Sequence, residues 1–394
     1  MANMMAVAEE ETNKPGGNEQ PASELTPEGR EIADRLDREL PADSEARDMF
    51  QDILQGRRLG PHDGWFRKAV AQTRFPWTAV CAEYDTNRDG VVTPAEFSGS
   101  EADFARLDHN GNGNLDEQDL SWGDHALNRT PGAMLFYRAD ADGNGKLTRM
   151  EFEQLFAQLA GTSGDFVSLD EMRAAVDTPT MVPQRPRRDQ PSITTLLRGL
   201  EQQEIGSLQP GPSINDRAID FTLKSVDGRR DVTLSDHIGT KPLVLVFGNF
   251  TCGPFRSQAG NVEKLYQRYN DRVEFLMVYV REAHPTDGWW MESNNRLGIE
   301  IAQPQTADER SAVARRCVSH LQLSFPVLVD GLDDRVGAQY SGMPSRLYVI
   351  DREGRIAYKS GRGPFGFKPA ECEQSLVFLL NHPTTIPRPG AGSR

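Results

Sequence analysis

The stretch Pro242-Leu-Val-Leu-Val-Phe-Gly-Asn-Phe-Thr-Cys-Gly-Pro-Phe255 decides the fold of the C-terminal half of this chain. It begins as a wholly apolar run, which is typical of a buried strand, and Gly253-Pro254 then shapes a turn into a helix that starts near Arg256. Cys252 is thereby delivered to a helix N-terminus. The helix dipole and the free backbone N–H groups there lower the pKa of a thiol, and the thiolate is the nucleophile. We therefore expect redox or nucleophilic sulfur chemistry at Cys252.

Strands and helices alternate from about Asn215 onward. The expected strands are 219–223, 242–247, 273–280, 326–329, 346–350 and 355–358. The expected helices are 258–269, 307–321, 334–340 and 368–380. A strand–helix–strand unit, another helix, a β-hairpin and a final helix form the thioredoxin layout. The sequence thus predicts an α/β thioredoxin-like C-terminal domain over residues 215–382.

The bulk composition restricts the class of protein. A chain of 394 residues is long enough for two domains, and 37% apolar with 26% charged residues is typical of a soluble globular protein. The net charge of −14 argues against nucleic acid or an anionic membrane as the main partner. No run of 18 or more apolar residues occurs, so we expect no membrane span.

The cysteines and the N-terminus bear on localisation. Cys81, Cys252, Cys317 and Cys372 lie far apart without a C-x-x-C pair, which fits a reducing compartment better than a secreted disulfide framework. The N-terminus lacks a basic segment and a full apolar segment, so no signal peptide is visible. We therefore expect a cytoplasmic protein. The alternative is export, because Ala6-Val7-Ala8 resembles the end of a signal peptide that a misplaced start truncated.

The N-terminal half divides by composition. Residues 1–25 are polar and are predicted to be disordered, and residues 26–176 are predicted to form an all-α EF-hand domain that begins with two short helices. Residues 177–214 are rich in proline and are predicted to be a linker that contains one helical piece, 192–204. Residues 383–394 are expected to be a tail.

Three twelve-residue segments match the EF-hand loop, with oxygen ligands at positions 1, 3, 5, 7, 9 and 12 and glycine at position 6. The first is Asp85, Asn87, Asp89, Val91, Thr93 and Glu96. The second is Asp108, Asn110, Asn112, Asn114, Asp116 and Asp119. The third is Asp140, Asp142, Asn144, Lys146, Thr148 and Glu151. One such segment could be a solvated turn, but three within 67 residues predict Ca²⁺ binding.

The three loops are not equivalent. Loop 108–119 ends in Asp119, whose shorter side chain reaches a metal less easily in bidentate fashion, so we expect weaker Ca²⁺ binding or more Mg²⁺ character there. The stretch 161–171 lacks early acidic residues and is expected to be a non-binding partner of loop 140–151. We favour a structural role for Ca²⁺ over a sensor role, because the region is not rich in methionine.

Other residues are expected to meet Cys252 at one end of the sheet. Pro344 precedes a strand, where thioredoxin-like folds place a cis proline facing the thiol. Glu282, His284 and Asp287 follow the strand next to that of Cys252, at the edge where open α/β sheets bind ligands. A histidine beside a thiol can transfer its proton. Cys317 is read as a core residue with a minor alternative as resolving thiol. For each of these residues, the alternative is a purely structural role in packing.

Phe247-Gly-Asn-Phe-Thr-Cys-Gly-Pro-Phe255 and Glu282-Ala-His-Pro-Thr-Asp-Gly-Trp289 resemble the iodothyronine deiodinases. The resemblance continues through Phe325–Asp330, Pro344–Tyr348 and Gly363-Pro364, and it spans about 215–382. It implies a thioredoxin fold in which a nucleophile removes iodine from an aromatic ring and a thiol reductant restores the enzyme. Cys252 stands where animal members have selenocysteine. Glu282 and His284 match the proton-handling pair, and Arg346 with Pro344 is implied at the substrate.

The sequence therefore predicts a Ca²⁺-binding, deiodinase-like thiol oxidoreductase that uses Cys252, an aromatic substrate such as an iodothyronine, and an external thiol. Two alternatives stay open. One is a peroxiredoxin-like thiol peroxidase, in which the thiol attacks a peroxide oxygen. The other is a calcium-binding scaffold whose redox domain is inactive.

Overall fold

The computed structural model describes residues 25–56, 70–121, 130–160, 166–176 and 191–382. The predicted disordered N-terminus up to residue 24, the predicted tail, and residues 177–190 of the predicted linker 177–214 lie outside these residues. No helix in the described part of the chain combines the length and the apolar character needed to cross a membrane.

An eight-stranded mixed sheet forms the centre of the molecule, in the order β1-β8-β7-β4-β5-β6-β2-β3. The strands are β1 Gln72–Thr73, β2 Thr222–Ser225, β3 Asp231–Thr233, β4 Leu243–Gly248, β5 Glu274–Tyr279, β6 Val327–Val329, β7 Arg346–Ile350 and β8 Ile356–Lys359. β4 pairs in parallel with β5, as expected for the two strands of the predicted strand–helix–strand unit, and β7 lies antiparallel on the other side of β4. All residues of β4 are buried, as its apolar run predicts. β1 and β3 were not predicted, because each has only two or three residues.

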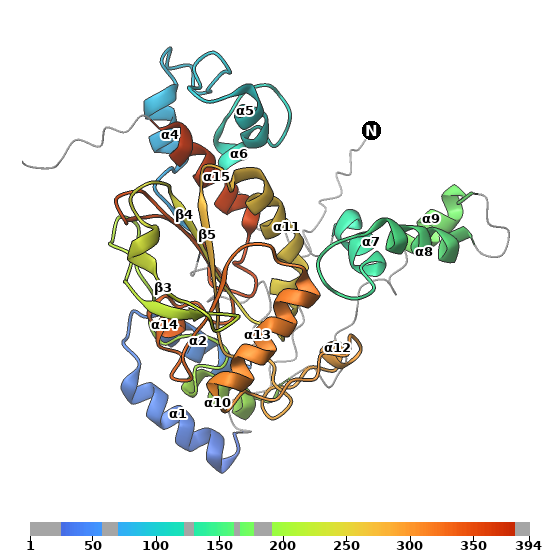
Figure 1. Ribbon diagram of the computed structural model, residues 1–394, viewed down its shortest axis with the longest axis vertical. Coiled ribbons are helices and arrows are strands. Elements are labelled where there is room, and N and C mark those ends of the chain that lie inside the picture. Colours follow the sequence, from blue (N-terminus) through green and yellow to red (C-terminus); the bar gives the residue numbers. More distant parts are fainter. Residues whose placement is uncertain (1–24, 57–69, 122–129, 161–165, 177–190, 383–394) are drawn as a thin grey trace, which may run out of the picture.

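Helices complete the thioredoxin-like layers around this sheet (Figure 1). They are α11 Gly253–Tyr269, α12 Glu292–Asn295, α13 Ala307–Leu321, α14 Arg335–Gln339 and α15 Pro369–Asn381, with a short 3₁₀ turn at Leu234–His237. Helix α11 begins at Gly253, earlier than predicted, with Cys252 as the capping residue and proline in its first turn. Proline suits this position because its missing N–H would have no partner inside the helix. The α/β thioredoxin-like fold of the C-terminal region is thus confirmed.

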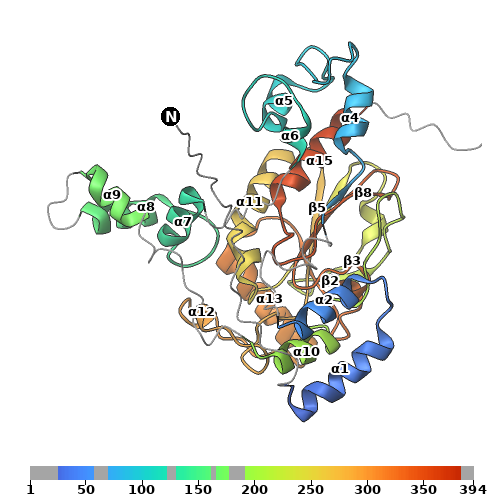
Figure 2. The same cartoon turned by 180° about the vertical axis from the view of Figure 1, so that it is seen from behind.

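Three helices from both sides of the EF-hand region form a separate apolar cluster. They are α1 Pro27–Glu39, α2 Glu45–Leu54 and α10 Ile193–Glu201. Leu36, Met49 and Leu197 are buried within this cluster, and Trp289 of the thioredoxin-like domain packs against it. The expected domain boundaries stay a prediction. Helices α1 and α2, which the sequence assigns to the EF-hand domain, contact α10, which it assigns to the linker. Figure 2 shows this cluster at the end of the sheet opposite helices α4 to α6.

The EF-hand region consists of two units. The first contains α4 Trp77–Tyr84, α5 Glu101–Leu107 and α6 Glu117–Leu120, and a β-bridge between Val92 and Leu115 joins its two loops. The second contains α7 Pro131–Ala139, α8 Arg149–Ala160 and α9 Leu169–Val176. Both views show the second unit projecting beside α11 (Figures 1 and 2). Part of the expected partner loop, 161–165, lies outside the described residues.

Candidate active site

Cys252 lies between the end of β4 and the first turn of α11, where the sequence places it, but it is only 1% exposed. Burial raises the pKa of its thiol to about 11, although the Phe255 backbone N–H, the Arg256 charge and the Ser345 hydroxyl act to lower this pKa. The expectation of a lowered pKa is therefore wrong for this conformation, because removal of water from the thiolate outweighs the helix N-terminus. Apart from this contact, the buried Ser345 hydroxyl has no hydrogen-bond partner among the residues that the structure describes.

Asn249 joins the three segments that surround the thiol. Its side-chain oxygen accepts hydrogen bonds from the backbone N–H groups of Cys252 at 3.0 Å and Ala283 at 3.3 Å. Its side-chain nitrogen donates to the Pro344 carbonyl at 3.0 Å. The Met343–Pro344 peptide bond is cis, as predicted. The amide of Asn249 thus fixes the positions of the cysteine turn, the Glu282 segment and the proline turn relative to one another.

Glu282 is fully buried next to this turn. One carboxylate oxygen accepts from the Thr251 backbone N–H at 2.9 Å and from the Thr251 hydroxyl at 2.7 Å, and the other accepts from the Tyr279 hydroxyl. Burial raises the pKa of the Glu282 carboxyl, and these hydrogen bonds oppose the rise. The structure therefore brings a buried carboxyl into contact with the residue that precedes the thiol, as the sequence indicates.

His284 and Asp287 follow on the same loop. The His284 backbone N–H donates to the Thr251 hydroxyl at 3.0 Å, while its ring lies against Trp289, with Nδ1 at 3.1 Å from the Trp289 carbonyl. Asp287 accepts from the Gln303 backbone N–H at 2.8 Å and is exposed. His284 is thus fixed beside Thr251 through its backbone.

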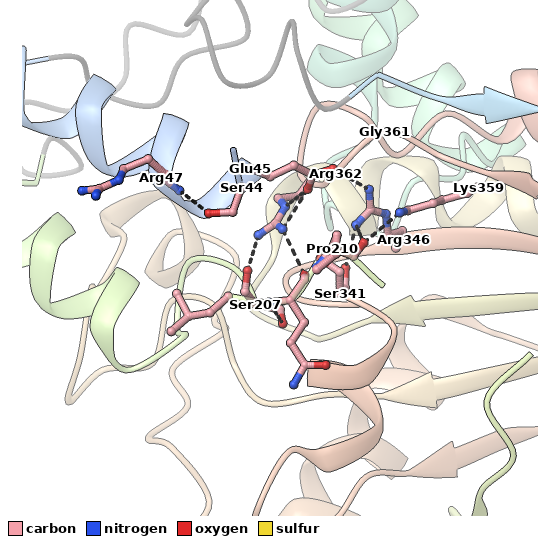
Figure 3. Close-up of polar contacts among 12 residues, drawn as sticks. Ser44, Glu45, Arg47, Ser207, Pro210, Ser341, Arg346, Lys359, Gly361 and Arg362 are labelled. Atoms are coloured by element: carbon pink, nitrogen blue, oxygen red, sulfur yellow. Dashed lines mark hydrogen bonds and ion pairs between the residues drawn. The ribbon is translucent and has the colours of Figure 1, made fainter. Parts of the chain in front are cut away.

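Arg346, an expected substrate contact, is fully buried in a cluster of cations (Figure 3). It donates to the Ser360 carbonyl at 3.1 Å, and Lys359 donates to the Pro210 carbonyl at 2.8 Å. The carboxylate of Glu45, from α2, lies 2.8 Å from Arg362 and 4.0 Å from Arg346. A role for Arg346 at the substrate stays a prediction.

The three EF-hand loops have the backbone geometry that Ca²⁺ requires. The position-6 residues Gly90, Gly113 and Gly145 have φ values of 89°, 85° and 76°, a region that favours glycine. In each loop, the N–H of this glycine donates at 2.9 Å to the first aspartate of the loop. Of the residues that the structure describes, Asp140, Asp142 and Glu151 form the one group of three carboxylates whose oxygens lie within 4.8 Å of one another. These all-oxygen loops fit Ca²⁺.

Some residues of the site were not singled out from the sequence. Asn249 and Thr251 are polar side chains directly after an apolar strand, and burial of such groups requires hydrogen bonds. That rule is the signal that could have found them. Arg256 was missed for a different reason. It is 3% exposed and donates to the Phe250 carbonyl at 2.6 Å and to Asn294 at 2.8 Å, and a charged residue in a helical first turn normally faces solvent.

Two family models match the chain. The iodothyronine deiodinase model matches residues 200–378, and the EF-hand model matches 82–98 and 133–157. The chain therefore carries EF-hand motifs, which support calcium binding. Loop 108–119 lies between the two matched segments.

Curated relatives carry the same name. The type I iodothyronine deiodinase of Xenopus laevis is 38% identical over 133 residues, which cover 34% of this chain and 50% of the relative. The type II enzyme of Sus scrofa is 30% identical over 192 residues, which cover 46% of this chain and 71% of the relative. The thyroxine 5-deiodinase of Gallus gallus is 31% identical, with 48% and 66% covered.

Solved structures include a thiol:disulfide interchange protein from Bacteroides sp., with 14% identity, coverage of 43% of this chain and 91% of that chain, and a TM-score of 0.31. The fold assignment rests on the strand order of the central sheet. The chain spans between half and about seven tenths of the length of the curated relatives it matches. The match to the family model and the identity to the Sus scrofa relative show that this chain belongs to the iodothyronine deiodinase family.

Proposed function

We propose that the chain reductively removes iodine from an aromatic substrate, such as an iodothyronine, with Cys252 as the nucleophile. The observation that carries the proposal is the junction at Asn249, which holds Cys252, the cis Pro344 and the loop of the buried Glu282 together. Family membership supplies the reaction type. Ca²⁺ bound in the EF-hand loops takes no part in the chemical steps.

The proposed reaction begins when the Cys252 thiolate attacks the iodine atom. A sulfur–iodine bond forms, the carbon–iodine bond breaks, and the ring carbon takes up a proton. An external thiolate then attacks the sulfenyl iodide, so that iodide leaves and a mixed disulfide forms. A second external thiol releases Cys252 and forms the oxidised reductant. Two thiols are thus oxidised for each carbon–iodine bond that is reduced to carbon–hydrogen.

Glu282 supports the proposal as the proton donor to the ring carbon. Its burial favours the protonated carboxyl, and its contact with Thr251 places it one residue from the nucleophile. His284 is proposed as its relay to solvent, because it is half-buried and its backbone is fixed to the same threonine hydroxyl.

The test is iodide release from iodinated phenols by the full chain with a dithiol reductant. Cys252→Ser should reduce the rate to background, whereas Cys317→Ser, a buried thiol on α13, should retain it. Retained iodide release in Cys252→Ser would contradict the proposal. Hydroperoxide consumption by the same preparations separates the deiodinase from a thiol peroxidase.

The burial of Cys252 favours one alternative, a calcium-binding scaffold whose redox domain is inactive. A thiol with a pKa of about 11 is scarcely ionised at neutral pH in this conformation. Alkylation at pH 7 decides between them. Modification of Cys252 within minutes supports the enzyme, because the site must then open to reagent, and resistance over hours supports the scaffold.

We further propose three Ca²⁺ sites, in loops 85–96, 108–119 and 140–151, with Mg²⁺ character in the second. The hydrogen bonds that the three loops share support this number. We also propose that the protein works in a reducing compartment such as the cytoplasm, where small thiols are available as reductants. The described cysteines, all of them free thiols, are consistent with this location.

A further inference from the structure

The backbone of loop 140–151 lies directly against α11, the helix that begins at Cys252. A Cβ atom on Gly145 would stand 2.1 Å from the Arg256 carbonyl oxygen, and one on Gly260 would stand 2.2 Å from the Gly145 carbonyl oxygen. Neither position has room for a side chain. The loop and the helix therefore pack backbone against backbone, at a separation that glycine at positions 145 and 260 permits.

The same loop is hydrogen-bonded to the end of α13. The Lys146 ammonium donates to the Gln322 carbonyl at 2.9 Å, and His320 Nε2 lies 3.1 Å from the Asp142 carbonyl. Loop 140–151 is thus held between two helices of the thioredoxin-like domain by residues at three of its twelve positions.

The helical segments that the loop touches are those that surround the thiol. The Arg256 backbone N–H donates to the Cys252 carbonyl at 3.1 Å, and the Arg256 guanidinium donates to the Phe250 carbonyl at 2.6 Å. The Phe250 ring in turn lies 5.2 Å from the ring of His320, centroid to centroid. Both contacts of the loop therefore lead to residues within four positions of Cys252.

We propose that Ca²⁺ in loop 140–151 lowers the reactivity of Cys252 through the Arg256–Gly260 turn of α11 and through His320. The proposal rests on the proposed function, which makes Cys252 the reactive group. Asp140, Asp142 and Glu151 repel one another at 4.8 Å or less when no cation lies between them, so the metal-free loop loosens. The metal holds the loop in the form that fits α11, and this fixes the turn that carries Arg256 in the arrangement in which the thiol is buried.

Loop 85–96 provides the matched comparison. In the described part of the chain, no atom lies within 4 Å of where a Cβ on the position-6 residue of this loop, Gly90, would stand, so no described helix contacts this loop at that point. Glu151→Gln weakens Ca²⁺ binding in loop 140–151, which contacts α11, and should abolish the effect of Ca²⁺ on Cys252. Glu96→Gln, the equivalent change in loop 85–96, should leave that effect in place.

The experiment measures alkylation of Cys252 by iodoacetamide in the full chain, with and without Ca²⁺, by mass spectrometry of its peptide. We expect Ca²⁺ to slow alkylation of the unaltered chain by about fivefold or more, as for a modest allosteric coupling. In Gly260→Ala this slowing should fall below about twofold, because the new methyl group excludes the loop. Asn261→Ala, the exposed next residue on α11, should behave as the unaltered chain.

A second measurement uses the reciprocity of coupling. Chains with alkylated and unmodified Cys252 should differ in Ca²⁺ affinity at loop 140–151, and this difference should vanish in Gly260→Ala. Equal alkylation with and without Ca²⁺, together with loss of iodide release in Cys252→Ser, would overturn the coupling and leave the proposed function intact. A Cys252 that resists alkylation in both states would overturn both.

Discussion

The first EF-hand unit, α4 to α6, shares its core with the central sheet, whereas the described buried residues of the second, α7 to α9, lie outside that core. In the first unit, Tyr84, Phe97 and Phe104 are at most 6% exposed and belong to the same apolar cluster as β4 and β7. The Phe97 ring lies 6.3 Å from that of Phe378 on α15. The first unit is therefore an integral part of the thioredoxin-like domain.

The second unit leaves much of its apolar surface exposed. Phe152, Phe166 and Leu169 are 53%, 73% and 66% exposed, and its buried residues belong to neither apolar cluster of the described chain. Its link to the domain includes the polar and glycine contacts of loop 140–151. We therefore expect Ca²⁺ to change how the second unit contacts the domain, because these contacts run through its metal loop. In the first unit, which shares the core of the domain, we expect Ca²⁺ to stabilise the fold.

The largest expected effect tests the shared core. Phe97→Ala should lower the free energy of unfolding of the whole thioredoxin-like domain by about 3–5 kcal/mol, because it leaves a cavity between α4, α5 and α15. Phe152→Ala in the second unit should change it by about 0.5 kcal/mol or less, because this side chain is exposed. Urea titration followed by tryptophan fluorescence measures both. Similar losses in the two variants would show that the units are attached in the same way.

Calcium removal should separate the units next. With Ca²⁺ at a hundredfold excess over its dissociation constant, binding stabilises the folded state by about 2.7 kcal/mol. Glu96→Gln should remove most of this gain from the main thermal transition, since loop 85–96 belongs to the common core. Glu151→Gln should leave the main transition nearly unchanged and instead reduce amide protection in α7 and α8. Calorimetry and hydrogen exchange, each with and without chelator, check the two outcomes.

The sequence predicts most of the sheet and the loops, for different physical reasons. The apolar run of β4 and the twelve-residue loop pattern are local signals, and both are confirmed in the structure. The pairing of α1 and α2 with α10 is not local, because about 140 residues separate them along the chain and an amphipathic helix does not indicate its partner. The burial of Cys252 was missed for the same reason, since the groups that cover it come from distant segments.

Helix α2 provides a third kind of attachment, through buried charge, because its Glu45 lies 2.8 Å from the buried Arg362, next to Arg346 and Lys359. Burial, and the charges of Arg346 and Arg362, lower the pKa of Lys359 to about 7. An unfolded lysine keeps its proton to about pH 10.4, so between pH 7 and 10 the unfolded chain binds more protons and stability rises with pH.

The slope in this pH range should be at most about 1.4 kcal/mol per pH unit. Lys359→Met should flatten it, while Lys224→Met, at an exposed position on β2, should not. Denaturant midpoints from pH 6.5 to 9.5 measure the slope. If the unaltered chain is flat across this range, the charge cluster does not set the attachment of α2.

The smallest expected effect lies within the first unit. Asp119 accepts from the His109 backbone N–H at 2.9 Å and from the Asp116 backbone N–H at 3.0 Å, much as Glu96 accepts in loop 85–96. A carboxylate one methylene shorter that keeps these bonds reaches the metal with one oxygen, so loop 108–119 should bind Ca²⁺ more weakly.

Asp119→Glu should strengthen Ca²⁺ binding there by about tenfold, or 1.4 kcal/mol, while the non-ligand change Glu117→Asp should have no effect. Isothermal titration of the full chain resolves the sites. Because the Val92–Leu115 bridge joins the two loops, a tighter second site should also raise the affinity of loop 85–96 and leave loop 140–151 unaffected. Equal affinities at all three loops of the unaltered chain would contradict the expectation and would remove the metal-binding difference between the two loops of the first unit.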